Sequence, residues 1–195
     1  CPWRCGYCHN PHLQPAIGPA ARDYPSTLAW LEGRRGLLDA VVFSGGEPTA
    51  QAALGSAMRE VAGRGFAIGL HTGGAYPRRL DEVIDDVDWI GLDVKAPASG
   101  YAAVTGIAGS AAAAGALPSR PLASAISGYA AVTGIAGSGA SAGESLRLVA
   151  ASGVDYEVRT TVHPDLVPDD ALVRLADELA SLGVRRWVLQ PFRPT

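Results

Sequence analysis

The segment that decides the fold is the run AVVFSGGEP, which extends from Ala40 to Pro48. Its first four residues are all apolar, whereas a half-exposed strand would alternate apolar and polar residues. A continuous apolar run is typical of a strand that is buried on both faces of a parallel sheet. Polar and glycine residues, Ser44 to Glu47, follow at once. The segment therefore predicts a buried strand that ends in a polar turn.

The alternation of helix and strand extends outward from this segment in both directions. The helix expected before it begins near Pro25, and its apolar face consists of Leu28, Leu31, Leu37 and Leu38. Further helices are expected at about 50–64, 78–86, 142–152 and 169–182, and further strands at 66–72, 89–95, 156–162 and 186–190. Strands and helices that alternate in this way form βα units with a parallel sheet and right-handed crossovers. We therefore predict an α/β fold with five strands, a partial barrel whose first strand, before Cys1, is missing.

Each expected strand ends in polar or glycine residues. These ends are Ser44–Glu47, His71–Gly74, Asp93–Lys95, Arg159–Thr161 and Gln190. The carboxyl ends of parallel strands meet at one rim, where the active sites of such folds lie. One polar strand end could be a simple turn, but five of them beside a cysteine loop predict a single site on this rim.

All three cysteines lie in the first eleven residues, CPWRCGYCHNP, with the spacing C-x3-C-x2-C. Three thiolates can hold a soft metal centre, but they leave one position of a four-coordinate site open for an exchangeable ligand. A Cys3His zinc site would add His9 to Cys1, Cys5 and Cys8. Adjacent Cys8 and His9 would have difficulty reaching one tetrahedral ion, so zinc is the less favoured alternative.

The composition narrows the class of protein. The chain has 195 residues and a net charge of −3, without the basic patch that nucleic-acid binding requires. No apolar run reaches the roughly 18 residues of a membrane span. Clustered cysteines of odd number argue against a secreted disulfide framework and favour a reducing cytoplasm. The chain begins at Cys1 without Met, so we expect a fragment of a longer protein.

A duplication interrupts the alternation of helix and strand. The twelve residues from Ser99 to Ser110 recur unchanged from Ser127 to Ser138. Two copies are too few for a solenoid, and the Gly, Ala and Ser composition is poor for a packed core. We therefore expect one domain, residues 1–195, with a low-complexity duplicated insertion at about 99–138. A flexible loop is preferred over a functional lid.

The cysteine spacing, with Tyr7 before the last cysteine and Gly-Gly-Glu after the next strand, resembles the radical S-adenosylmethionine (SAM) superfamily. The resemblance implies a partial (β/α)6 TIM-like barrel. It also implies that Cys1, Cys5 and Cys8 hold three irons of a [4Fe-4S] cluster while SAM chelates the fourth. The reduced cluster would cleave SAM to methionine and a 5′-deoxyadenosyl radical, which abstracts hydrogen from a substrate.

The same resemblance implies roles for the strand ends. Gly45 and Gly46 would let the backbone approach the methionine part of SAM, and Glu47 would accept a hydrogen bond from its ammonium group. The remaining residues expected to bind the cofactor are Tyr7 near the adenine, Thr72, Asp93 and Lys95 at polar groups of SAM, and Arg159 at its carboxylate. His71-Thr72-Gly73-Gly74 departs from the Asp-Thr-Asn-Gly that activases often carry here. A role for His71 in SAM binding is therefore left open against a simple strand-end histidine.

Within the superfamily, several segments look like activating proteins of the anaerobic ribonucleoside-triphosphate reductase. They are CPWRCGYCHNP, LHTGGAYP, DVKAP and QPFRPT. This resemblance implies hydrogen abstraction from a glycine Cα of the reductase, with a flavodoxin- or ferredoxin-type protein as electron donor. Three alternatives stay open: an activase of another glycyl-radical enzyme such as pyruvate formate-lyase, a radical SAM enzyme acting on a small molecule, and a non-catalytic metal or electron-transfer module.

Overall fold

A computed structural model describes residues 1–97 apart from Arg4, Gly6, Ala16, Ile17 and Pro19, and then residues 138–163 and 167–193. The strands are β1 (Ala40–Phe43), β2 (Ala67–Thr72), β3 (Trp89–Asp93), β4 (Asp155–Val162) and β5 (Trp187–Pro191). The helices are α1 (Tyr24–Glu32), α2 (Leu54–Ala62), α3 (Pro77–Asp81), α6 (Ser138–Ser152) and α7 (Asp169–Ser181). Three short 3-10 turns are η1 (Pro11–Leu13), η2 (Pro48–Ala50) and η3 (Ile84–Asp86). The predicted duplicated insertion lies outside the described residues except for Ser138, which begins α6.

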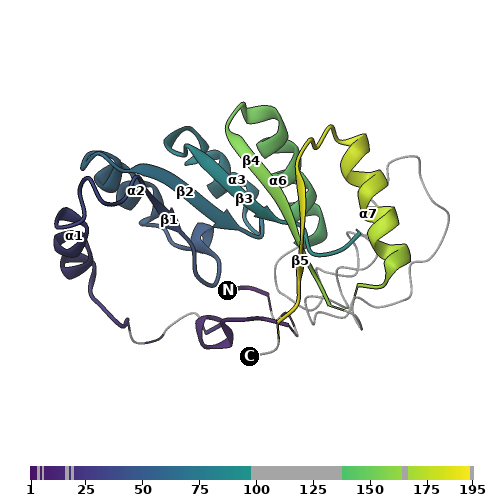
Figure 1. Ribbon diagram of the computed structural model, residues 1–195, viewed down its shortest axis with the longest axis horizontal. Helices are drawn as coiled ribbons and strands as arrows, with labels where there is room; N and C mark the ends of the chain where they lie inside the picture. Colours follow the sequence, from purple (N-terminus) through teal and green to yellow (C-terminus); the bar gives the residue numbers. More distant parts are fainter. Residues whose placement is uncertain are drawn as a thin grey trace.

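The five strands form one parallel sheet in the order β1-β2-β3-β4-β5 (Figure 1). Strand order follows chain order, so every crossover joins neighbours through a helix, as expected for βα units. The register pairs Asp93 with Arg159 and Thr161 with Gln190, so polar strand ends stand side by side. The predicted α/β fold with five parallel strands is confirmed.

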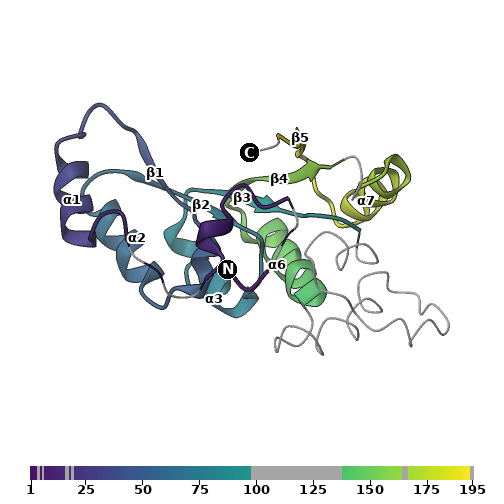
Figure 2. The same ribbon diagram turned by 90° about the horizontal axis from the view of Figure 1, so that it is seen from below.

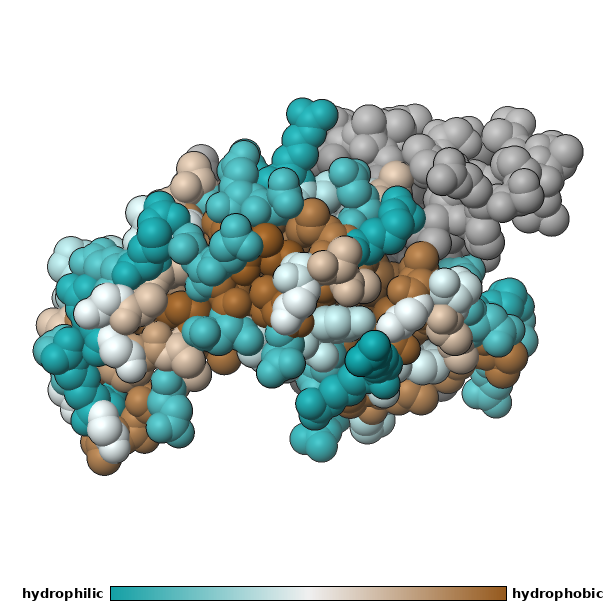
Figure 3. All heavy atoms as spheres, turned by 90° about the horizontal axis from the view of Figure 1, so that it is seen from above, coloured by the Kyte–Doolittle hydropathy of each residue, from teal (hydrophilic) through white to brown (hydrophobic). Residues whose placement is uncertain are grey.

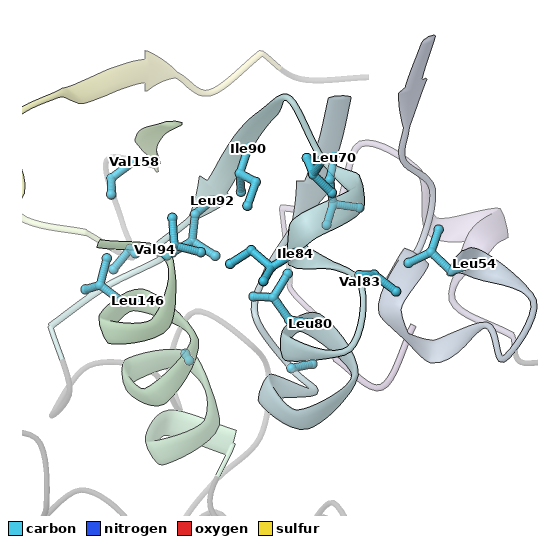
Figure 4. Close-up of a cluster of buried hydrophobic side chains, with 14 of the residues drawn as sticks. Leu54, Leu70, Leu80, Val83, Ile84, Ile90, Leu92, Val94, Leu146 and Val158 are labelled. Atoms are coloured by element: carbon cyan, nitrogen blue, oxygen red, sulfur yellow. The ribbon is translucent and has the colours of Figure 1, made fainter. Parts of the chain in front are cut away.

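The two faces of the sheet have different surroundings. Figure 2 shows α2, α3 and α6 together on one side of the sheet, and none of the described helices covers the other side. Side chains alternate between faces along each strand. The helix-covered face carries the centre of the core, in which the strand residues Ile68, Leu70, Ile90, Leu92 and Val158 are at most 1% exposed. Figure 4 labels the last four of them. Each such burial contributes roughly 1.5–3 kcal/mol, so this face holds the fold together.

The face without helices is more polar. It carries His71, Trp89, Asp93 and Arg159, with Gly91 between them. A Cβ at Gly91 would meet the side chains of Arg159, His71 and Trp89 at 2.9–3.0 Å. Glycine is therefore the residue that lets these three large side chains pack over the middle of the sheet.

Two details of the sequence-based prediction are wrong. β1 is an edge strand, and Val42 is 45% exposed on the helix-free face, so the apolar run is not buried on both faces. The pattern of apolar residues along the sequence does not distinguish an edge strand from a central one. Helix α1 ends at Glu32, before Leu37 and Leu38, because a turn with Gly36 at a φ of 74° follows. Leu37 is consequently 75% exposed.

Hydrophobic residues are exposed on one side of the molecule. The view from the side away from both marked termini shows hydrophobic residues along the middle of the molecule and hydrophilic residues around them (Figure 3). Within the part of the chain that the structure describes, no helix has both the length and the apolar character needed to cross a membrane.

Candidate functional site

A pocket of about 280 Å³ opens at the carboxyl ends of the strands. Residues following or ending all five strands line it, together with the cysteine loop, which we define as Cys1–Asn10. The pocket lining includes every residue that the sequence placed in the site: Cys1, Cys5, Tyr7, Cys8, Gly45, Gly46, Glu47, Thr72, Asp93, Lys95 and Arg159. The structure therefore brings the predicted site residues together at one place, the predicted rim.

The three cysteines are free and partly buried. A tight turn, in which the Cys8 backbone N–H donates to the Cys5 carbonyl oxygen at 3.1 Å, brings these two residues close together. Burial raises the pKa of the Cys5 thiol, and the nearby Lys95 ammonium opposes that rise. Among the described residues, no three His, Cys, Asp or Glu side chains gather around one single-ion position of the kind that tetrahedral zinc occupies. Three thiols on one loop beside a cation fit the donor set of an iron–sulfur cluster, in which each thiolate binds its own iron.

The cysteine loop rests on the ends of β2 and β3. Trp3 is 3% exposed and lies against Gly73, where a Cβ would overlap its indole ring. The Lys95 ammonium, after β3, lies 5.7 Å from the ring centre of Trp3 and 5.8 Å from that of Tyr7. Such cation–π contacts stabilise by roughly 0.5–2 kcal/mol. Lys95 thus links the loop to the sheet, a position from which it also faces the pocket.

The other side of the cysteine loop contacts the last strands. Tyr7 stacks with His163 at a ring distance of 6.3 Å, and His9 stacks with Phe192 at 5.8 Å. The ring centres of His163 and Phe192 lie 4.5 Å apart. His9 Nε2 is 3.2 Å from the Arg193 carbonyl oxygen. Phe192 is not among the site residues predicted from the sequence. The only signal for it was an aromatic residue just after the final polar strand end.

Gly45 and Gly46 are glycines for different reasons. Gly45 has a φ of 134°, which only glycine adopts without strain, and nothing lies within 4 Å of its would-be Cβ. Gly46 instead abuts the cysteine loop, because a Cβ there would overlap the Leu13 carbonyl oxygen and stand 3.0 Å from the Cys1 nitrogen. Gly45 is the residue at which the backbone faces open pocket, and Gly46 is the residue on which the loop sits.

We expect Gly46→Ala to displace the cysteine loop from the sheet. Overpacking of this kind costs roughly 1–3 kcal/mol, and the backbone carbonyl of Leu13 cannot rotate away as a flexible side chain can. In iron-free protein, the reaction rate of the cysteines with a thiol reagent should rise several-fold. Gly33→Ala is the matched control, since its Cβ would meet only the Trp30 carbonyl oxygen at an ordinary 3.6 Å. Equal thiol reactivity in the two variants would contradict this account.

Glu47 is 5% exposed and its carboxylate is bonded on both oxygens. Oε1 accepts from Thr49 N at 3.1 Å, Thr49 Oγ1 at 2.6 Å and Thr72 Oγ1 at 2.7 Å, and Oε2 accepts from Gly73 N at 3.0 Å. A carboxylate offers about four lone-pair sites. Oε1 accepts three of these bonds and Oε2 only one, so Oε2 keeps an acceptor site for a further donor. The ammonium-binding role predicted for Glu47 stays a prediction. What Glu47 does in the structure is fasten the turn after β1 to the end of β2.

Asp93, Lys95 and Arg159 form one charged group. Asp93 Oδ1 accepts from Arg159 Nε at 3.2 Å and from Arg159 Nη2 at 2.9 Å, and its Oδ2 lies 3.4 Å from Lys95 Nζ. The Arg159 side chain is only 11% exposed. Arg159 Nη1 lies 3.0 Å from His71 Nε2 and 3.5 Å from its Nδ1. His71, whose role the sequence left open, is thus part of the charged group.

The pKa of His71 is lowered, first by burial and then by the Arg159 guanidinium, while Asp93 and Glu157 oppose the shift. A histidine takes up its proton near pH 6.5 in the unfolded chain. Below that pH the unfolded state binds a proton that the folded state does not, so the free energy of unfolding should fall as the pH drops below about 6.5. His71→Gln should flatten this pH dependence in urea unfolding between about pH 5 and 8. His12→Gln, at an exposed position, is the control. A slope unchanged by His71→Gln would show that His71 does not titrate abnormally.

The fold and the pocket define a parallel α/β protein whose site sits at the strand ends under a three-cysteine loop. A family model described as the radical SAM superfamily matches residues 1–113. This match covers more than half of the 195 residues, so the chain belongs to the radical SAM superfamily. Membership implies an iron–sulfur cluster and SAM as cofactors.

A curated relative comes from Methanocaldococcus jannaschii and is provisionally named a glycyl-radical enzyme activating enzyme. The two chains are 32% identical over 100 residues, which are 49% of this chain and 40% of the relative.

Solved structures show the same fold at low identity. SuiB of Streptococcus suis bound to S-adenosylmethionine matches 99% of this chain and 37% of its own, with a TM-score of 0.58 and 10% identity. The protein anSMEcpe with bound AdoMet and a Kp18Cys peptide matches 99% of this chain and 48% of its own, with a TM-score of 0.63 and 11% identity. The structure of TYW1 with a lysine-pyruvate adduct matches 100% of this chain and 62% of the TYW1 chain, with a TM-score of 0.59 and 17% identity. These matches agree with a five-stranded part of a TIM-like barrel. The chain spans less than two thirds of the length of each of these proteins.

Proposed function

We propose that the chain is the radical SAM part of a glycyl-radical enzyme activase. The observation that carries the proposal is that the three thiols of one loop and the polar ends of all five strands line one pocket. In this proposal Cys1, Cys5 and Cys8 would hold a [4Fe-4S] cluster, which would supply the electron for the reductive cleavage of SAM.

In this proposal different residues of the pocket bind different parts of SAM. Gly45 leaves open space for the methionine part, and Arg159 and Lys95 offer cationic donors to polar groups of SAM. Asp93 holds both cations in place. Tyr7 supplies an aromatic ring for the adenine, and Thr72 keeps Glu47 fastened at the end of β2.

We propose a protein as the substrate, and a glycine Cα of an anaerobic ribonucleoside-triphosphate reductase as the hydrogen donor. The segments that resemble reductase activating proteins and the name of the Methanocaldococcus jannaschii relative support this partner. A flavodoxin- or ferredoxin-type electron donor in the cytoplasm completes the proposal. We also propose that residues 1–195 belong to one radical SAM domain, with the duplicated segment 99–138 as an insertion.

Anaerobic reconstitution with iron, sulfide, reductant and SAM tests the reaction class. The reaction should release 5′-deoxyadenosine and methionine. Incubation with candidate reductases should then give the electron paramagnetic resonance signal of a glycyl radical. A cluster-loaded, full-length protein that releases no 5′-deoxyadenosine would overturn the proposal. Release of 5′-deoxyadenosine with a small molecule, and no radical on any reductase, would instead favour the small-molecule enzyme. A cluster spectrum that SAM leaves unchanged would favour the electron-transfer module.

A further inference from the structure

Arg159 lies between a carboxylate and an imidazole. Its Nε and Nη2 donate to Asp93 Oδ1 at 3.2 and 2.9 Å, and its Nη1 lies 3.0 Å from His71 Nε2. A guanidinium has five N–H donors and no acceptor. Three of these donors are used by Asp93 and His71, which leaves two. With its side chain 11% exposed and lining the pocket, Arg159 can give the remaining donors to a ligand there.

His71 is fixed from two directions. Its ring packs edge-on against Trp89, with the ring centres 5.4 Å apart, and the opposite contact is the guanidinium of Arg159. Both side chains lie over Gly91, where a Cβ would meet Arg159 and His71 at 2.9 Å. Because Arg159 Nη1 lies 3.0 Å from Nε2 and also 3.5 Å from Nδ1, the guanidinium faces the imidazole ring and not the lone pair of one nitrogen. A cation over an aromatic ring is attracted most strongly when the ring is neutral. The charged groups that face it are Arg159 and Glu157 on β4 and Asp93 on β3.

A neutral His71 adds no charge to the group formed by Asp93, Lys95 and Arg159. Lys95 and Arg159 carry one positive charge each, and Asp93 carries one negative charge, so the group keeps one positive charge in excess. An aspartate at position 71 would cancel that excess. It would also compete as a second carboxylate for the guanidinium. The histidine therefore preserves both the charge and the free donors of Arg159.

We propose that His71 is a positioning residue that acts through Arg159. By packing its ring against Nη1, it holds the guanidinium in the orientation that presents the two remaining donors to a ligand carboxylate. This inference rests on the proposed function, in which that carboxylate belongs to SAM. His71 itself needs no contact with the ligand.

The test compares two ligands that differ only in the carboxylate. S-adenosylhomocysteine and its decarboxylated analogue are titrated calorimetrically into the anaerobically reconstituted protein. Hydrogen bonds to a charged group predict that the wild type binds the carboxylate-bearing ligand about ten- to a hundredfold more tightly. His71→Ala should reduce this ratio by about tenfold, and His71→Asp should reduce it at least as much. His71→Phe keeps a flat ring that can face the guanidinium and should keep most of the ratio. His12→Ala is the matched control and should keep all of it.

The outcomes separate this inference from the proposed function. If the wild type binds neither ligand, both fail. If it binds both ligands equally, SAM binding stands while the inference fails. If it discriminates and both His71→Ala and His71→Asp discriminate as well as the wild type, only the inference fails. Nitrogen-15 NMR of labelled histidine in the wild type is a second measurement that needs no variant. A neutral His71 at pH 7 is expected, and an imidazolium signal would overturn the inference.

Discussion

Cys5→Ala is expected to abolish stable iron binding. Each of three thiolates holds one iron in the proposed cluster, so removal of one leaves two of the four irons without a protein ligand. Burial raises the pKa of the Cys5 thiol, and the nearby Lys95 ammonium opposes that rise. After anaerobic reconstitution, iron and sulfide content and the visible charge-transfer absorbance should fall to near background.

The matched control for this experiment is Asn10→Ala. Asn10 belongs to the same loop and lines the same pocket, but it has no sulfur. This variant should bind a normal amount of iron. The far-ultraviolet circular dichroism of both variants should match the wild type, because Cys5 is only partly buried. Normal iron content in Cys5→Ala would rule out the proposed ligand set.

Glu47→Ala is expected to cause the largest loss of folding stability among single pocket substitutions. It removes the acceptor for Thr49 N, Thr49 Oγ1, Thr72 Oγ1 and Gly73 N, inside a site where Glu47 is 5% exposed. Each buried donor left unpaired costs roughly 1–3 kcal/mol. Water can enter the space vacated by the side chain, so the net loss should be about 3–5 kcal/mol. Urea unfolding of the iron-free protein measures it.

A graded substitution separates hydrogen bonding from loss of volume. Glu47→Gln keeps the size and can keep one oxygen, but its NH₂ group would then face the Gly73 N–H, donor against donor. We expect a loss of roughly 1–3 kcal/mol, between the wild type and Glu47→Ala. Glu60→Gln is the control, because Glu60 is exposed and its pairs with Arg64 and Tyr24 are at the surface, where such contacts contribute about 0–1 kcal/mol. A Glu47→Ala variant no less stable than Glu60→Gln would show that the buried bonds are not stabilising.

Much of the rim could be predicted because parallel strands place their carboxyl ends together. Asp93, Lys95 and Arg159 are far apart in the sequence, yet β3 and β4 pair in a register that sets Asp93 beside Arg159. An apolar run followed by polar residues is enough to predict where each strand ends. The cysteine spacing predicts the remaining part of the site, since three thiols on eight residues must lie on one loop.

What could not be predicted depends on contacts between side chains that no local pattern encodes. Two of the hydrogen bonds to Glu47 come from Thr72 and Gly73, at the end of another strand. The partnership of His71 with Arg159 requires Gly91 beneath both. The exposure of Val42 depends on the edge position of β1, which an apolar run does not reveal. In each case contacts between distant parts of the chain decide the arrangement, and the local preference of the sequence for helix or strand does not predict them.

The contacts of His9 with Phe192 and with the Arg193 carbonyl oxygen have a consequence for the order of folding. The hydrogen-bond partners His9 and Arg193 are separated by 184 positions in the chain. Contacts with so large a separation carry the greatest loop-closure cost and form late. During synthesis the cysteine loop is made long before β5, so its contacts with Phe192 and Arg193 wait until β5 has been made and has joined the sheet. The cysteine loop is therefore among the last parts of the pocket to reach its final shape.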